Sequence, residues 1–156
     1  MGGDTGRPDG SFTVNAGGSA GAPVGRLLLV DDEEPLVELL TLALDDLGYR
    51  VSGFVDSEAA LAAFVGAPDE YDALVSDLSM PRLSGLDLAA RVVKERPGLP
   101  VVLTSGWVRP EDEAAGAALG IRGLVAKGSS VDEIVRGIDR ALREGAPGGA
   151  PRAGSG

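Results

Sequence analysis

The sequence predicts a small doubly wound α/β domain, in which five parallel strands in the order 2-1-3-4-5 are covered by helices on both faces. Three observations lead to this fold class. Between Arg26 and Glu144, short apolar runs alternate five times with segments of helical period, as expected of βα units. The runs are continuously apolar, which is typical of parallel strands buried on both faces. A chain of 156 residues has room for one ordinary domain.

The first unit starts with the run RLLLV, which ends at Asp31 and Asp32. Pro35 then opens a helix, which Gly48 ends. The apolar residues expected to share one face of this helix are Leu36, Leu39, Leu40, Ala43, Leu44 and Leu47. The second unit is the run YRVSGF, followed by a helix from about Glu58 to Val65.

The third run, DALVSD, ends on Asp77 and precedes a helix from about Leu86 to Arg96. The fourth run, PVVLTS, precedes an alanine-rich helix from about Pro110 to Leu119. The fifth run, GLVAK, ends on Lys127. The residues that form one apolar face of the last helix are Val131, Ile134, Val135, Ile138, Ala141 and Leu142.

Glycine content divides the chain into a domain and two tails. Of 24 glycines, 8 lie in residues 1–25 and 5 in residues 145–156. We therefore expect a flexible tail or linker over 1–25, a domain over 26–144 and a flexible tail over 145–156. One short alternating stretch, Ser11 to Val14, fits either a strand or a linker, and the glycine-rich surroundings favour the linker.

Composition excludes several classes of function. A net charge of −10 repels nucleic acid and anionic lipid, so we expect protein partners or cations. The chain has no cysteine and no histidine, which excludes thiolate and imidazole chemistry. No apolar run approaches the length of a membrane span and no secretory signal precedes the domain, so a cytoplasmic location is expected.

Polar residues gather where the predicted strands end. Asp31 and Asp32 end the first strand, Asp77 the third, Thr104 and Ser105 the fourth, and Lys127 the fifth. In a sheet of order 2-1-3-4-5 the first strand lies beside the third, so the three carboxylates should meet where the strand order reverses. Each acid taken alone fits a helix cap or a turn better than a functional site. Together they indicate a functional site.

Three neighbouring carboxylates require a counter-charge, and an all-oxygen ligand set selects a hard cation such as Mg²⁺. Because Mg²⁺ sites are often completed by phosphoryl oxygens, the pattern points to phosphoryl transfer. In that chemistry Asp77 would be the nucleophile, with the Lys127 ammonium and the Ser105 hydroxyl neutralising charge on the transferred group.

The segments LLLVDDEEP, VSDLSMPRLSGLDL, LPVVLTSG and GLVAKG resemble those of a response-regulator receiver domain of two-component signalling, over Arg26 to about Arg143. The resemblance implies a flavodoxin-like, CheY-like (βα)5 fold. It implies that Asp77 accepts the phosphoryl group and that Mg²⁺ is held by Asp31, Asp32, Asp77 and the backbone carbonyl of Ser79. The donor would be a histidine kinase or a histidine phosphotransfer protein. The output would pass through protein contacts to a downstream target.

The resemblance also implies secondary roles and shows two departures. Ser105 would turn toward the phosphoryl group, Lys127 would pair with it, and Trp107 would border the path by which water reaches the acyl phosphate. The Trp107 indole would either screen the phosphoryl group from water, which we favour, or cover the fourth helix as a surface residue. Where the family usually has proline after its lysine this chain has Gly128, so a trans bond is expected. Leu124 stands where many receivers have Tyr or Phe, which leaves an aromatic switch in question.

Three functions remain open from the sequence. The first is a phosphoacceptor with slow self-dephosphorylation and no separate catalytic domain, either a stand-alone regulator or the receiver of a hybrid kinase. The second is a pseudo-receiver that binds partners without phosphorylation. The third is a magnesium-dependent aspartyl phosphohydrolase, which the missing D-x-D pair at Asp77 disfavours.

Overall fold

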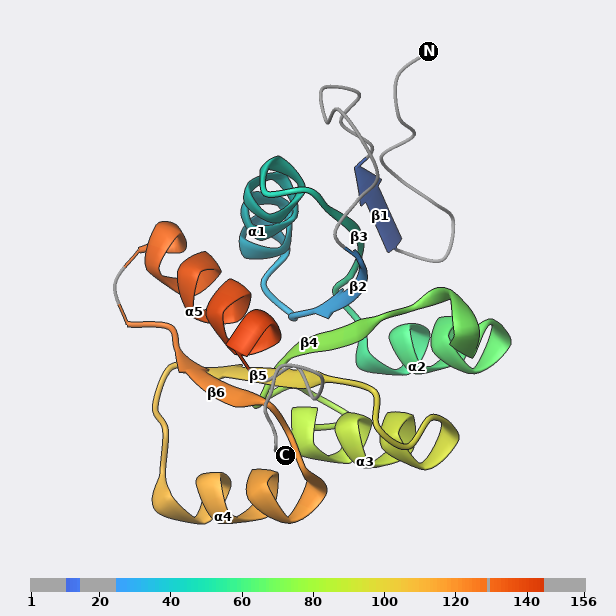
Figure 1. Cartoon of the computed structure of the whole chain (residues 1–156), viewed down its shortest axis with the longest axis vertical. Coiled ribbons are helices and arrows are strands. Elements are labelled where there is room, and N and C mark those ends of the chain that lie inside the picture. Colours follow the sequence, from blue (N-terminus) through green and yellow to red (C-terminus); the bar gives the residue numbers. More distant parts are fainter. Residues whose placement is uncertain (1–10, 15–24, 129, 145–156) are drawn as a thin grey trace.

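A computed structural model describes residues 11–14, 25–128 and 130–144 (Figure 1). Its strands are β1 (Ser11–Val14), β2 (Gly25–Val30), β3 (Tyr49–Phe54), β4 (Ala73–Asp77), β5 (Val101–Ser105) and β6 (Gly123–Ala126). Its helices are α1 (Glu34–Asp46), α2 (Ser57–Gly66), α3 (Gly85–Glu95), α4 (Pro110–Leu119) and α5 (Val131–Glu144), with a short 3₁₀ turn at Pro68–Glu70.

The sheet has the predicted topology. Five strands are parallel and lie in the order β3-β2-β4-β5-β6, which is the order 2-1-3-4-5 of the predicted units. Each of these five strands is followed by a helix, so every crossover returns the chain to the same end of the sheet. The predicted fold class is therefore confirmed, and the carboxyl ends of the strands share one edge.

Helices cover both faces of the sheet. α1 and α5 pack on one face and α2, α3 and α4 lie on the other (Figure 1). Each face has its own core, because strand side chains alternate between the two sides. Leu28, Val30 and Leu74 pack with α2 and α3, whereas Leu27 and Leu29 pack with α1 and α5.

The buried face of α1 differs from the predicted one. Leu40 and Leu44 are buried as expected, together with Val37, but Leu39 is 51% exposed and Leu47 is exposed as well. α1 is apolar around much of its circumference, so its pattern does not define which stripe meets the sheet. Contact with β3 and α5 makes that choice.

The expected linker at Ser11–Val14 is instead a strand. β1 pairs antiparallel with β3 and adds a sixth strand at the edge of the sheet, with Ser11 opposite Phe54 and Val14 opposite Val51. An unpaired edge strand offers a row of free backbone donors and acceptors, and β1 meets that row. The expected tails over 1–10, 15–24 and 145–156 lie outside the described residues.

Within the described residues, no helix is both long enough and apolar enough to cross a bilayer.

Candidate functional site

The carboxyl edge of the sheet brings the predicted residues together. Backbone hydrogen bonds carry the strand pairing just past the strand ends: Asp31 N–H donates to Phe54, Leu78 N–H to Thr104 and Lys127 N–H to Ser105. These bonds fix the register of neighbouring strand ends, so the residues that follow each strand emerge side by side.

Three carboxylates converge there. Asp31, Asp32 and Asp77 each offer an oxygen, and these oxygens lie within 4.8 Å of one another. Asp31 is 1% exposed and Asp77 is 6% exposed, whereas Asp32 is open to solvent. Asp31 is held in place by the Glu33 N–H, which donates to its Oδ1 at 2.9 Å. The predicted acid cluster is thus present at the point where the strand order reverses.

Lys127 is the cation that faces this cluster. Its Nζ lies 2.8 Å from Asp31 Oδ2 and 3.2 Å from Asp77 Oδ1. One ammonium therefore serves two buried carboxylates while Asp32 stands beside them. The site has an excess of negative charge, which suits a divalent cation.

The protonation equilibria reflect this crowding. Burial, followed by the negative charge of Asp31, raises the pKa of Asp77 to about 6, and the nearby Lys127 only partly opposes the rise. Burial of Lys127 acts to lower its pKa, but its hydrogen bonds and charge contacts with Asp31 and Asp77 outweigh burial and raise the pKa. Asp77 is consequently a carboxylate whose charge the metal-free fold disfavours.

The loop after Asp77 folds back tightly on the strand end. Gly85 N–H donates to the Leu78 carbonyl at 2.8 Å. A Cβ on Gly85 would clash with the Asp77 carbonyl oxygen and come within 2.8 Å of Leu78 Cα. Glycine is therefore required at the end of this loop for steric reasons. Ser79, two residues beyond Asp77, is exposed and lines the cleft described below.

The hydroxyl of Ser105 is engaged away from the acids. It donates to the Trp107 carbonyl at 2.8 Å and accepts from the Trp107 N–H at 3.1 Å. Thr104 is buried and pairs with Asp77 across β4 and β5. The Trp107 side chain is 77% exposed, so the indole does not cover Asp77 in this structure; the surface alternative fits it better than the screening role.

A cleft of about 580 Å³ opens above the cluster. Asp32, Asp77, Ser79 and Lys127 line it, together with Ser130 and the start of α5.

The structure also describes Gly128 and Leu124, the two departures from the family pattern. Among the described residues there is no cis peptide bond, so the bond after Lys127 is trans as expected. Leu124 on β6 is partly buried against the α2 and α3 core.

Some residues that shape the site were not predicted. Asp56 and Ser57, at the start of α2, bind the loop that follows Asp77, through Arg82, Pro81 and Leu83. The pair Asp56-Ser57 reads as a helix N-cap, and Asp56 does accept from the Ala59 N–H at 3.0 Å. No local pattern indicates the contact with Arg82, because 26 residues separate the partners.

Comparison with known proteins agrees with this geometry. The family model described as "Response regulator receiver domain" matches residues 27–139. The probable transcriptional regulatory protein TcrX of Mycobacterium tuberculosis is 36% identical over 123 residues, which is 79% of this chain and 51% of TcrX. TcrA of the same organism is 30% identical, over 85% of this chain and 54% of TcrA. The chain thus spans about half the length of these relatives.

Solved structures show the same fold. The non-phosphorylated HemR receiver domain of Leptospira biflexa is 29% identical, with a TM-score of 0.67 over 75% of this chain and 93% of its own. Response regulator protein TrrA of Thermotoga maritima, solved in complex with Mg(2+)-BeF, is 28% identical, with a TM-score of 0.64 over 75% of this chain and 98% of its own. The chain belongs to the response regulator receiver domain family of two-component systems.

Proposed function

We propose that residues 26–144 form a phosphoacceptor receiver, in which Asp77 takes a phosphoryl group from a histidine kinase or a histidine phosphotransfer protein. The observation that carries the proposal is the placement of Asp77. Its carboxylate lies at an open cleft, 3.2 Å from the Lys127 ammonium and in a cluster with two further acids.

The transfer is a displacement at phosphorus. A carboxylate oxygen of Asp77 forms a bond to the phosphorus of a phosphohistidine as the P–N bond breaks. The electron pair of that bond stays on the imidazole nitrogen, which takes a proton from solvent. Lys127 can stabilise the negative charge on the transferred group, because its ammonium is already directed at Asp77.

Magnesium fits the residues present. Asp31, Asp32 and Asp77 supply hard oxygen ligands within reach of one another, and Ser79, whose carbonyl would be a further ligand, lines the same cleft. When bound, Mg²⁺ would neutralise charge on the acids and on the phosphoryl oxygens. Because carboxylates outnumber ammonium groups at this edge, the uncompensated negative charge favours binding of a cation.

Ser105 would change its hydrogen bonds when Asp77 is phosphorylated. Its hydroxyl is now bound to the backbone of Trp107, and a phosphoryl group on Asp77 would present strong acceptors to it. We propose that Ser105 turns from Trp107 to the phosphoryl group. Loss of the hydrogen bonds between Ser105 and Trp107 would then change the loop before α4, and with it a surface that a downstream protein binds.

The matched relatives are named transcriptional regulatory proteins, and this chain matches about half of TcrX. The exclusion of nucleic acid that follows from the charge is accordingly proposed for residues 26–144 alone. The relatives are regulators and not hydrolases by name, so we propose no enzymatic role beyond slow self-dephosphorylation.

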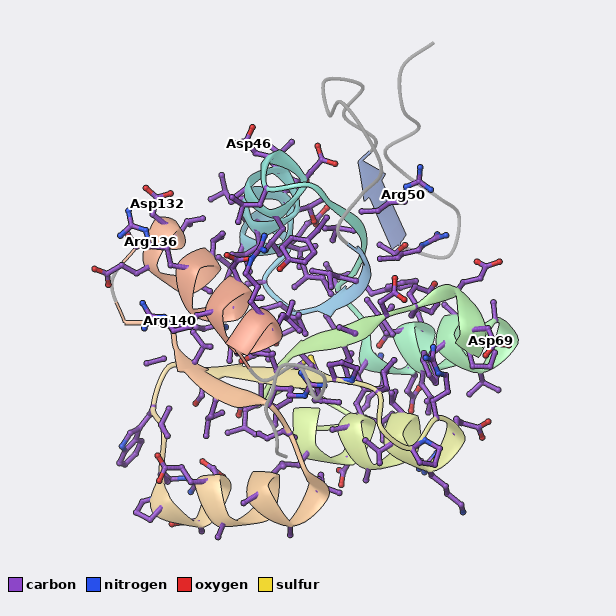
Figure 2. All side chains as sticks on the ribbon, viewed as in Figure 1. Asp46, Arg50, Asp69, Asp132, Arg136 and Arg140 are labelled. Carbon is purple, nitrogen blue, oxygen red and sulfur yellow. The ribbon has the colours of Figure 1, made fainter. Side chains whose placement is uncertain are left out.

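Intact-mass spectrometry tests the proposal. The protein is incubated with Mg²⁺ and acetyl phosphate, and we expect one added phosphoryl group that hydroxylamine removes, as it does an acyl phosphate. Asp77→Asn should show no addition. Asp69→Asn is the matched control, since Asp69 projects from the surface near the end of α2 (Figure 2) and should be modified like the parent. An unmodified parent under all donor conditions would favour the pseudo-receiver.

A further inference from the structure

The loop over residues 78–84, which leaves Asp77 and leads into α3, is fastened to the first turn of α2. Ser57 Oγ donates to the Pro81 carbonyl at 3.2 Å and accepts from the Leu83 N–H at 3.3 Å. Arg82 Nη1 lies 2.6 Å from Asp56 Oδ1. We call Asp56, Ser57 and Arg82 the loop anchor.

The anchor holds the loop in a conformation it would not favour alone. Arg82 has a φ of 70°, in the left-handed region that non-glycine residues seldom occupy. Such a conformation persists when surrounding contacts fix it. The two residues beside Arg82 are those that Ser57 binds, and Ser57 is 2% exposed, so water does not replace its hydroxyl.

The helix side of the anchor is also fixed. Asp56 uses both carboxylate oxygens: Oδ2 accepts from the Ala59 N–H and caps α2, while Oδ1 meets Arg82. Glu58 lies 4.0 Å from the same guanidinium. The start of α2, a helix that packs on the sheet, therefore fixes the position of the loop.

Contacts hold the loop at two places, its middle and its end. At its end, Gly85 is bonded to Leu78 and packed against the Asp77 carbonyl. In its middle, the anchor holds residues 81–83. Ser79 lies between Asp77 and the anchored turn, and it lines the cleft.

We propose that Asp56, Ser57 and Arg82 are positioning residues for the cation, which orient the Ser79 carbonyl without touching the ion. The inference rests on the proposed function, because it assumes a Mg²⁺ site that includes Ser79. It adds that the affinity for Mg²⁺ depends on the first turn of α2. Residues that orient metal ligands commonly change metal affinity when they are replaced.

The direction in which Mg²⁺ affinity changes when Arg82 is replaced distinguishes a positioning role from a purely electrostatic one. Removal of the positive Arg82 near a cation site should increase affinity for Mg²⁺ if only charge matters. If Arg82 positions the loop, its removal should decrease affinity. The ion pair with Asp56 is largely exposed, so its loss should change the melting temperature of the metal-free protein little.

Titration calorimetry with MgCl₂ on the full chain provides the test. We expect Arg82→Gln and Ser57→Ala to weaken Mg²⁺ binding, by about tenfold where the hydroxyl is lost and somewhat less where the ion pair is lost. Arg82→Lys should restore most of the affinity, because the charge still reaches Asp56. Arg50→Gln is the charge control: Arg50 projects from β3 at the opposite end of the sheet (Figure 2), so its loss should not weaken binding.

Two results overturn the inference, and they are distinguishable. If the parent binds Mg²⁺ and Arg82→Gln binds it equally or more tightly, the anchor does not position a ligand and the proposed function stands. If the parent itself fails to bind Mg²⁺, the proposed metal site is wrong and the inference is lost with it. Ser57→Ala removes a buried hydroxyl, so circular dichroism checks that this variant folds. If Ser57→Ala is unfolded, the test depends on Arg82→Gln.

Discussion

At the amino end of the sheet Asp139 faces two donors, whereas at the carboxyl end three carboxylates lie around one ammonium. Asp139 on α5 accepts from the Tyr49 hydroxyl at 2.6 Å and from Arg143 at 2.8 Å. At the other end, Lys127 lies between Asp31 and Asp77, and Asp32 lies beside them.

The difference indicates what each end contributes. The polar contacts of Asp139 at the amino end pair its carboxylate with a hydroxyl and a guanidinium, and so stabilise the fold. The carboxyl end keeps buried negative charge that lowers stability until a cation or a proton neutralises it. A site of this kind exchanges some folding free energy for binding, which is common where function and stability compete.

Replacement of Lys127 should produce the largest loss of stability. Lys127→Met leaves Asp31 and Asp77 facing each other without a cation, and breaking a buried pair in this way costs about 3 kcal/mol. Mg²⁺ should recover much of the loss by replacing the ammonium. Thermal unfolding with EDTA and with Mg²⁺ measures both effects. Equal melting temperatures of variant and parent in EDTA would show that the ammonium does not hold the acids together.

Replacement of Asp77 should act in the opposite direction. Because its pKa is raised to about 6, ionisation of Asp77 is less favourable in the folded protein than in the unfolded chain. Asp77→Asn removes that charge and should stabilise the metal-free protein by roughly 1–3 kcal/mol. Urea unfolding in EDTA measures the gain, and Asp132→Asn, at the exposed start of α5 (Figure 2), is the control. A variant less stable than the parent would mean that Asp77 makes net favourable contacts.

Removing a hydrogen bond at the amino end should lower stability alone. Tyr49→Phe removes the hydrogen bond to Asp139 and should cost about 1 kcal/mol without changing Mg²⁺ affinity. Burial and that hydrogen bond raise the pKa of Tyr49 above its ordinary value. The contribution of Tyr49 to stability is therefore present below pH 10 and declines as the pH rises past the unfolded pKa of about 10.

Unfolding free energies of parent and Tyr49→Phe from pH 8 to 11 test the linkage. The difference between the two proteins should shrink as the unfolded tyrosine ionises. A constant difference across that range would contradict the raised pKa, and a change in Mg²⁺ affinity would contradict the separation of the two ends.

The smallest effect is expected at Trp107. Its indole is exposed, so Trp107→Ala should change stability by less than about 0.5 kcal/mol and leave the rate of dephosphorylation unchanged. The fluorescence of the parent should still respond to a beryllofluoride complex, because Ser105 would release the Trp107 backbone. Faster loss of phosphate from Trp107→Ala would restore the screening role.

Much of the site follows from the sequence because its parts are local. Each candidate residue ends an apolar run, and a parallel sheet necessarily brings those ends to one edge. Asp31, Asp77 and Lys127 could therefore be placed together from their positions in the chain. The direction of the Ser105 hydroxyl could not be predicted, because it depends on backbone groups of the loop that follows.

By itself the sequence determined the succession of strands and helices, the residues at the carboxyl edge and the hard-ligand chemistry they support, since periodicity and strand ends are local properties. The strand order followed from the usual arrangement of the doubly wound fold class. Tertiary structure alone decided three features. It paired β1 with the free edge of β3, selected which leucines of α1 are buried, and joined Arg82 to Asp56 across 26 residues. Each depends on which surfaces meet after the chain has folded, and local patterns carry no information about such long-range partners.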